Sequence, residues 1–412
     1  MEPIKIIMLG GRRCGKTSAL ASMFDQMQNG PVNRFLTSSD ETKKQDKVVS
    51  PITGEIESQD SLTVKAEELE GFFSEPRPGR FDYRRSIFLI DQNPTYNIWR
   101  YTLRMKDPNE GRDIFNRYHF DIDFYDIPGE YCRDYIHVND NSPITSEEIK
   151  SKMERLLNES DICMIMVDTP YLMEADDSIC KTVNCVKHLK SYLQNILDGE
   201  AKLVVFVPIK CEKWVKSGKI NEVNKRIREV YQPIITDLGQ PSRSKVSVAI
   251  VPIETAGNIV FCEFKDAKLA TFYDREQDAN KTVRCCETSD PKYVRLESGE
   301  TFPKESAIGK IQDDPRAKIQ KDSKILRPYS WFKMKSLKKK DWKYEPHNCD
   351  VLAMHLLKFI VEKYSQEGPG SWGRFFGGGI TKGRMKEILK SIEESGLIIE
   401  NADGIEYIQK RI

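Results

Sequence analysis

The chain has 412 residues, 39% of them hydrophobic, with 64 basic and 63 acidic side chains and a formal net charge of +1. This length and apolar content allow a large globular core, while the balanced charge argues against nucleic acid or an anionic membrane as a partner recognised through net charge. The 10 cysteines form no C-x-x-C pair, and no apolar run approaches the ~20 residues that span a bilayer, so we expect a cytoplasmic protein with buried free thiols, no structural zinc and no membrane span.

The first motif lies between a strand and a helix. Residues 3 to 9 have the length and β-branched content of a buried strand, and hydrophobic residues recur at helical spacing from 20 to 27. The octapeptide at 10 to 17 matches the phosphate-binding loop (P-loop) pattern G-x-x-x-x-G-K-[ST], whose glycines let the backbone approach a phosphate chain. Lys16 would lie between the β- and γ-phosphates, and the Thr17 hydroxyl would bind Mg²⁺. The predicted nucleotide-binding residues here are Gly10, Gly11, Arg12, Arg13, Cys14, Gly15, Lys16, Thr17 and Ser18.

A second motif follows a polar insertion at about 31 to 86 that prolines and glycines interrupt. Strands are predicted at 86 to 90, 98 to 105 and 118 to 125, and the third ends in Asp126-Ile127-Pro128-Gly129-Glu130. An acidic residue at the end of a strand beside the P-loop strand can hold Mg²⁺, and the Gly129 amide can reach the γ-phosphate. Asp-x-Pro-Gly alone is an ordinary turn. After a P-loop, however, it indicates that Asp126 binds the metal.

Helices and apolar strands alternate from 146 to 251, with one helix expected from Asp176 or Asp177 to 196 and another from roughly 219 to 238. The pattern predicts an α/β fold, the P-loop NTPase three-layer sandwich with a mostly parallel sheet, two insertions and a small C-terminal α+β unit. The strands at 202 to 207 and 246 to 251 end in two further polar motifs, Lys210-Cys211-Glu212 and Glu254-Thr255-Ala256-Gly257. Ligands gather at the carboxyl ends of the strands in such a sheet.

Residues 1 to 261 are predicted to form the core, and three further segments follow it in the chain. Residues 262 to 345 are a second insertion in which lysines alternate with aromatic residues. Such residues can grip nucleic acid or an anionic head group, but a solvated face is their commoner origin. A helix at 346 to 364 is expected to close the core. Residues 365 to 412, after glycine-rich breaks, are expected to form a winged-helix-like unit whose mixed charges favour a protein contact over DNA.

The four motifs, in this order, resemble those of the P-loop GTPases of the translation-factor and Ras-like class. The resemblance covers roughly 1 to 28, 96 to 261 and 350 to 364. It implies that the chain binds GTP and GDP with Mg²⁺ and hydrolyses GTP. It also implies that Lys210 packs on the base and that Glu212 accepts the guanine N–H groups. Thr255 and Ala256 match the family's last nucleotide-binding loop.

Some positions depart from the family pattern. Glu212 replaces a shorter Asp, Ile209 replaces Asn or Thr, and Gly257 replaces Lys, so that guanine preference and ATP use are both compatible with the motifs. Arg13 is similar to the internal arginine finger of guanylate-binding proteins, or else it faces a carboxylate on an insertion or a second subunit. Glu130 stands where Ras-like proteins carry the water-orienting Gln.

The switch threonine, expected to serve both catalysis and the metal, is assigned to Thr95, with Thr37 as the alternative. The whole pattern is also similar to GTPases encoded in bacterial conflict and defence loci. Two functions follow from it: a GTP-hydrolysing switch, or a nucleotide-binding assembly component with little hydrolysis. Either would meet a protein partner, a second copy included, through the insertions and the C-terminal unit.

Overall fold

The chain divides into two compact units. The first comprises Met1–Leu69, Pro94–Thr255 and Pro346–Ile412, and the second comprises Glu70–Asn93 and Ala256–Glu345. The computed structural model describes residues 4–11, 14–29, 36–38, 46–49, 56–59, 86–88, 98–106, 119–132, 146–194, 202–243, 245–257, 259–265, 268–274, 278–288, 290–296, 301–313, 329–334, 345–366, 382–398 and 404–410.

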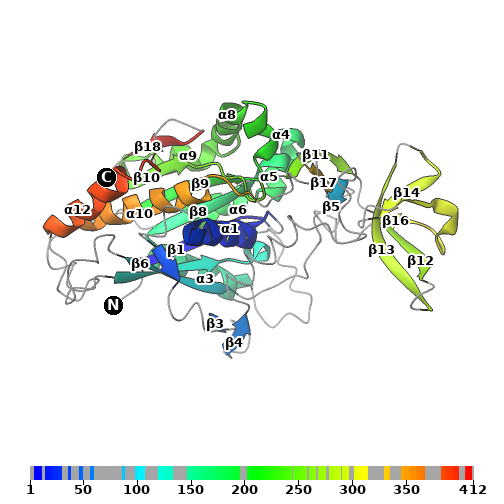
Figure 1. Cartoon of the computed structure of the whole chain (residues 1–412), viewed down its shortest axis with the longest axis horizontal. Helices are drawn as coiled ribbons and strands as arrows, with labels where there is room; N and C mark the ends of the chain where they lie inside the picture. Colours follow the sequence, from blue (N-terminus) through cyan, green and yellow to red (C-terminus); the bar gives the residue numbers. More distant parts are fainter. Residues whose placement is uncertain are drawn as a thin grey trace. The chain divides into compact units, whose positions relative to one another are not determined.

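An eight-stranded, mostly parallel sheet forms the centre of the first unit (Figure 1). Its order is β18-β10-β9-β8-β1-β7-β6-β2. The five strands from β10 to β7 run parallel, while β18, β6 and β2 join antiparallel. The strands are β1 (Ile4–Leu9), β2 (Leu36–Ser38), β6 (Trp99–Lys106), β7 (His119–Asp126), β8 (Ile162–Asp168), β9 (Lys202–Ile209), β10 (Val246–Ile250) and β18 (Glu406–Gln409), beside a separate hairpin of β3 (Asp46–Val49) and β4 (Ile56–Gln59).

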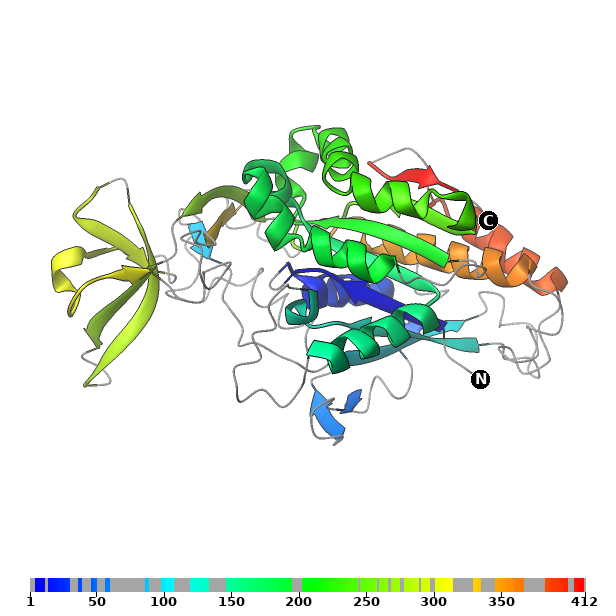
Figure 2. The same cartoon turned by 180° about the vertical axis from the view of Figure 1, so that it is seen from behind.

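Helices cover both faces of this sheet. On one face α10 packs against α1 and α12, and on the other α6 packs against α3 and α9, as the opposite views in Figures 1 and 2 show. β8 and β9 are buried at every position because both of their faces are covered. The predicted three-layer α/β fold is confirmed. Among the described helices, none is long and apolar enough to cross a membrane. The bounds are α1 (Lys16–Asn29), α3 (Ser146–Glu159), α6 (Val186–Leu193), α9 (Gln232–Leu238), α10 (Cys349–Gln366) and α12 (Lys382–Glu393).

Two helices that the periodicity predicts as continuous are broken. The helix expected from 219 to 238 is α8 (Ile220–Val230) followed by α9, which has Pro233 in its first turn, where the missing proline amide is tolerated. The helix expected up to 196 is α5 (Asp177–Val183) followed by α6. Cys185 between them has a φ of 55°. Two short helices, α4 (Thr169–Glu174) and α7 (Glu212–Lys216), both contact α8.

The described part of the C-terminal segment belongs to the main core. β18 is the edge strand next to β10, and α12 packs on α10. Ile388, Ile392 and Ile405 are buried in the same cluster as the sheet. The structure thus differs from the separate unit expected at 365 to 412, because the apolar face of α12 finds its partner in α10 and the strand finds an unpaired sheet edge.

The second unit consists of antiparallel sheets, of which the sequence analysis predicted only the strand at 86 to 90. A three-stranded sheet has the order β11-β17-β5, so a strand from the first insertion pairs with the second insertion. A five-stranded sheet, β15-β14-β13-β12-β16, has a small core of its own that includes Phe272, Cys285 and Val294. The bounds are β5 (Ser86–Phe88), β11 (Ile259–Lys265), β12 (Lys268–Asp274), β13 (Ala279–Glu287), β14 (Tyr293–Leu296), β15 (Thr301–Pro303), β16 (Gln312–Asp313) and β17 (Tyr329–Met334).

Candidate functional site

The P-loop turns sharply between β1 and α1. Gly15 has a φ of 104°, in the region that favours glycine. A Cβ added at Gly11 would lie 2.0 Å from the carbonyl oxygen of Val183, at the end of α5. The Cys14 amide donates to the Gly11 carbonyl at 3.3 Å, and the Ala19 amide donates to Gly15 at 2.9 Å. Glycines at these two positions therefore allow a tight turn pressed against a neighbouring backbone segment.

Lys16 lies on the loop that precedes it. Its ammonium donates to the carbonyl oxygens of Gly10 and Gly11, each at 3.3 Å. The residue is only 8% exposed. These bonds hold a positive charge at the turn, beside the N-terminus of a 14-residue helix, where backbone amides and the helix dipole already favour an anion.

A hydroxyl and a carboxylate from distant parts of the chain meet beside this turn. Thr17 in the first turn of α1 donates from Oγ1 to Oδ2 of Asp126 at 2.5 Å. Asp126 is the last residue of β7 and is opposite Met8 of β1 in the register of the two parallel strands. Both side chains offer the oxygen ligands that Mg²⁺ prefers, so the donor set fits this ion. Gly129 is buried and begins the short 3₁₀ helix Gly129–Cys132 that follows.

The third motif forms a buried ion pair that the sequence analysis missed. Lys210, with a φ of 61°, follows β9, and its Nζ lies 2.6 Å from Oδ2 of Asp168. Asp168 is fully buried at the end of β8. An acidic residue at the carboxyl end of the neighbouring parallel strand was the available signal, since the register places Asp168 opposite Ile209.

Glu212 begins α7 and is 2% exposed. The thiol of Cys211 beside it lies 3.3 Å from the Thr169 hydroxyl and donates to the Pro208 carbonyl at 3.2 Å. Burial raises the pKa of this thiol well above its usual value, so the thiol stays protonated. The Lys210–Glu212 turn is therefore packed rigidly at the end of β9.

The last motif is tied to α1. The Ser22 hydroxyl donates to the Thr255 carbonyl oxygen at 2.9 Å. Glu254, just before it, pairs its backbone with His347 in both directions, at 3.0 and 2.9 Å. Thr255 is the last residue of the first unit in this part of the chain, and Ala256 is the first residue of the second unit.

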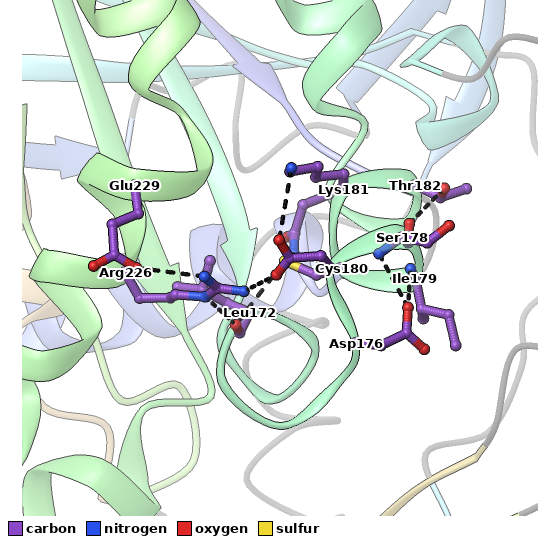
Figure 3. Close-up of polar contacts among 11 residues, drawn as sticks. Leu172, Asp176, Ser178, Ile179, Cys180, Lys181, Thr182, Arg226 and Glu229 are labelled. Atoms are coloured by element: carbon purple, nitrogen blue, oxygen red, sulfur yellow. Dashed lines mark hydrogen bonds and ion pairs between the residues drawn. The ribbon is translucent and has the colours of Figure 1, made fainter.

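Helix α5 lies between the P-loop and α8, because its last residue, Val183, lies against Gly11 and its first residue, Asp177, bonds Arg226 of α8. Asp176 caps α5 by accepting from the amides of Ser178 and Ile179, both at 3.0 Å. Arg226 of α8 donates to the Leu172 carbonyl at 3.4 Å, as Figure 3 shows, and it also donates to the carboxylate of Asp177. That hydrogen bond lowers the pKa of Asp177. The N-terminal end of the helix that ends against Gly11 is thus held by its Asp176 cap and by Arg226.

Charges from three strand ends act on one buried thiol of the P-loop. Burial raises the pKa of Cys14, Lys16 and Lys210 oppose the rise, and Asp168 and Asp126 add to it. The first, second and third motifs, together with Asp168, therefore lie close together around the turn.

The other predicted site residues are described only in part. Ser18 lies in the first turn of α1. Thr37 lies in β2, opposite Arg104 of β6, and the backbone of Glu130 lies in the 3₁₀ helix. Across the described part of the chain, no group of three or more His, Cys, Asp or Glu side chains could hold a metal ion. Arg12, Arg13 and Thr95 fall outside the described residues.

Comparisons with known proteins give similarities at low sequence identity. No protein-family model and no curated protein matches the chain. Among solved structures, the bacterial selenocysteine-specific elongation factor EF-Sec is 11% identical with a TM-score of 0.24, covering 83% of this chain and 44% of that one. The S. cerevisiae Ski7 GTPase-like domain is 9% identical in two structures. Bound to GTP it has a TM-score of 0.31, covering 81% of this chain and 75% of that one, and bound to GDP and inorganic phosphate it has 0.27, covering 82% and 76%. The chain thus spans less than half of the elongation factor.

Proposed function

We propose that the chain binds GTP, hydrolyses it to GDP with Mg²⁺, and acts as a nucleotide-dependent switch or assembly component. The observation that carries this proposal is the 2.5 Å contact between Thr17 and Asp126 beside the Lys16 ammonium. Residues 109 positions apart supply a hydroxyl, a carboxylate and a cation at one turn. That combination suits a metal-bound triphosphate.

Each group has a proposed role. The Lys16 ammonium would leave the loop carbonyls for the phosphate oxygens, which are stronger acceptors because they are charged. Thr17 and Asp126 would hold Mg²⁺, which when bound neutralises charge on the phosphates. Hydrolysis is assigned to Arg13, Glu130 and Thr95.

The guanine preference is proposed from Glu212. Its buried carboxylate at the start of α7 would accept from two neighbouring N–H donors, a pair that guanine offers and adenine lacks at the same edge. The charge-assisted bonds would contribute about 1.5–3 kcal/mol each. Because glutamate is one carbon longer than the family's aspartate, ATP is the competing ligand.

The proposal is tested on the purified full chain. Affinities for GTP and ATP are measured by competition against a fluorescent guanine nucleotide, and phosphate release is followed over many turnovers with and without Mg²⁺. We expect tighter binding of GTP and Mg²⁺-dependent release. Binding without release would favour the assembly component, and absence of binding to either nucleotide would refute the proposal.

A further inference from the structure

The ion pair between Asp168 and Lys210 joins the ends of two neighbouring strands. Their Oδ2 and Nζ atoms lie 2.6 Å apart, and the two side chains are 0% and 9% exposed. A buried ion pair of this kind contributes little net stability, but removing one partner alone is strongly destabilising because it leaves a buried charge uncompensated. The role of this ion pair is therefore better explained by the atoms that it positions than by net stability.

The carboxylate is fixed independently of the lysine. Oδ1 of Asp168 accepts from the Tyr171 amide at 3.3 Å, which caps α4. The backbone amide of Asp168 donates to Oδ1 of Asn184 at 2.8 Å. The position of the Asp168 carboxylate is thus fixed by α4 and by the α5–α6 junction, and the Lys210 side chain extends to this fixed acceptor.

The lysine stem runs beside the P-loop. A Cβ added at Gly15 would lie 3.8 Å from Cε of Lys210 and 3.2 Å from Cδ1 of Ile209. Lys210 adopts a left-handed φ of 61°, which a non-glycine residue adopts only when its surroundings require it. With the ammonium bound to Asp168, the four-carbon stem has one defined course next to Gly15.

We propose that Asp168 is a positioning residue of the nucleotide site. It neutralises the Lys210 ammonium and fixes the stem, so that Lys210 offers a purine base a carbon surface and no free charge. This inference rests on the proposed function and adds Asp168 to it: Asp168 positions Lys210, and Lys210 contacts the base.

Charge-matched variants test the inference. Asp168→Asn keeps a helix-capping side chain but leaves the ammonium buried without its counter-charge. Asp168→Asn/Lys210→Met removes both charges and keeps an unbranched stem. The control is Asp176→Asn, which alters the equivalent cap of α5 (Figure 3) at a carboxylate with no lysine partner among the described residues. GTP affinity and thermal unfolding are measured for the full chain with each substitution.

We expect Asp168→Asn to bind GTP about tenfold more weakly or worse, the double variant to return to within about threefold of the wild type, and Asp176→Asn to stay within about twofold. Rescue by the double variant is the readout that mere loss of fold would not produce. Unchanged GTP affinity in Asp168→Asn would overturn the proposal. A double variant as weak as Asp168→Asn would also overturn it, because the ammonium itself would then be what the nucleotide requires.

Two further outcomes are decisive. If Asp168→Asn does not fold, the double variant, which buries no charge, decides in the same way. If neither folds, Asp168 belongs to the fold alone and the proposal fails. Absence of GTP binding by the wild-type protein would refute the proposed function and this inference together, whereas wild-type binding with unaffected variants would refute only the inference.

Discussion

The Lys16 ammonium donates to two carbonyl oxygens of its own loop, at 3.3 Å each. We therefore expect Lys16→Ala to abolish measurable nucleotide binding with little effect on stability, because long neutral-acceptor bonds contribute less than charged bonds to phosphate, which are worth about 1.5–3 kcal/mol each. GTP binding and thermal unfolding measure the two effects. Lys219→Ala, at an exposed lysine that pairs with Glu222, is the matched control. Retained GTP affinity in Lys16→Ala would contradict the P-loop assignment.

Glu212 is the residue on which base recognition depends in this proposal. Glu212→Gln keeps the shape of the side chain but removes its charge and one acceptor oxygen. We expect the ratio of GTP to ATP affinity to fall by about 10-fold to 100-fold, which corresponds to about 1.5–3 kcal/mol. Glu222→Gln, at an exposed glutamate of α8, is the control. An unaltered ratio would place base recognition elsewhere.

The limits of sequence reasoning at the residue scale follow from separation along the chain. The P-loop residues are contiguous, so one pattern predicts Gly15, Lys16 and Thr17 together. Asp126 could be predicted because a strand ends there. Asp168, the acidic residue at the end of an apolar strand, was a signal in the sequence, but its pairing with Lys210 was not, because the contact spans 42 residues and depends on which strands are neighbours and in which register.

Elements were predictable where the chain repeats a pattern locally. The apolar runs of β8 and β9 indicate strands buried on both faces, and the structure has them in the middle of the sheet. The break between α5 and α6 has no comparable signal, because Cys185 is neither glycine nor proline. The partner of β18 was also hidden, since β10 lies more than 150 residues earlier in the chain.

The attachment of α12 to the core gives a test at this scale. Ile392 is fully buried in the main cluster, so Ile392→Ala should lower the free energy of unfolding by about 2–5 kcal/mol. Lys390→Ala on the exposed side of the same helix, where the lysine pairs with Glu394 at 3.6 Å, should change it by about 0.5 kcal/mol or less. Unfolding of the nucleotide unit in denaturant is measured through the loss of bound nucleotide. If Ile392→Ala leaves that transition unchanged, α12 is energetically separate from the nucleotide unit.

At the scale of the whole molecule, a notable property is the number of buried thiols in the first unit. Burial is the largest cause of a raised pKa for Cys14, Cys163 and Cys180, and for Cys211 and Cys349. The sequence predicted buried free cysteines, and every described cysteine of this unit is free and buried. Because these thiols are protonated when buried, the stability of the fold should depend on pH in the alkaline range.

The sign of that linkage is fixed by which state loses its proton first. A thiol in the unfolded chain ionises near its ordinary pKa of 9.0, whereas burial raises the pKa of folded Cys180 to about 11. The stabilising effect is therefore complete below pH 9.0 and is lost as the pH rises towards about 11. Each such thiol should lower the free energy of unfolding by up to about 1.4 kcal/mol per pH unit in this window.

We expect urea unfolding under reducing conditions to show constant thiol-linked stability between pH 7 and pH 8 and a steep decline between about pH 9 and pH 10, below the range in which the buried tyrosines add their own effect. Cys180→Ala supplies the control, because it removes one thiol whose side chain is fully buried. The variant is expected to be less stable at every pH, since it leaves a small cavity, but its decline should be shallower by the share of one thiol. A wild-type stability that stays level or rises across this window would show that the folded chain ionises its thiols as readily as the unfolded one, and would contradict the burial of these thiols from which the prediction comes.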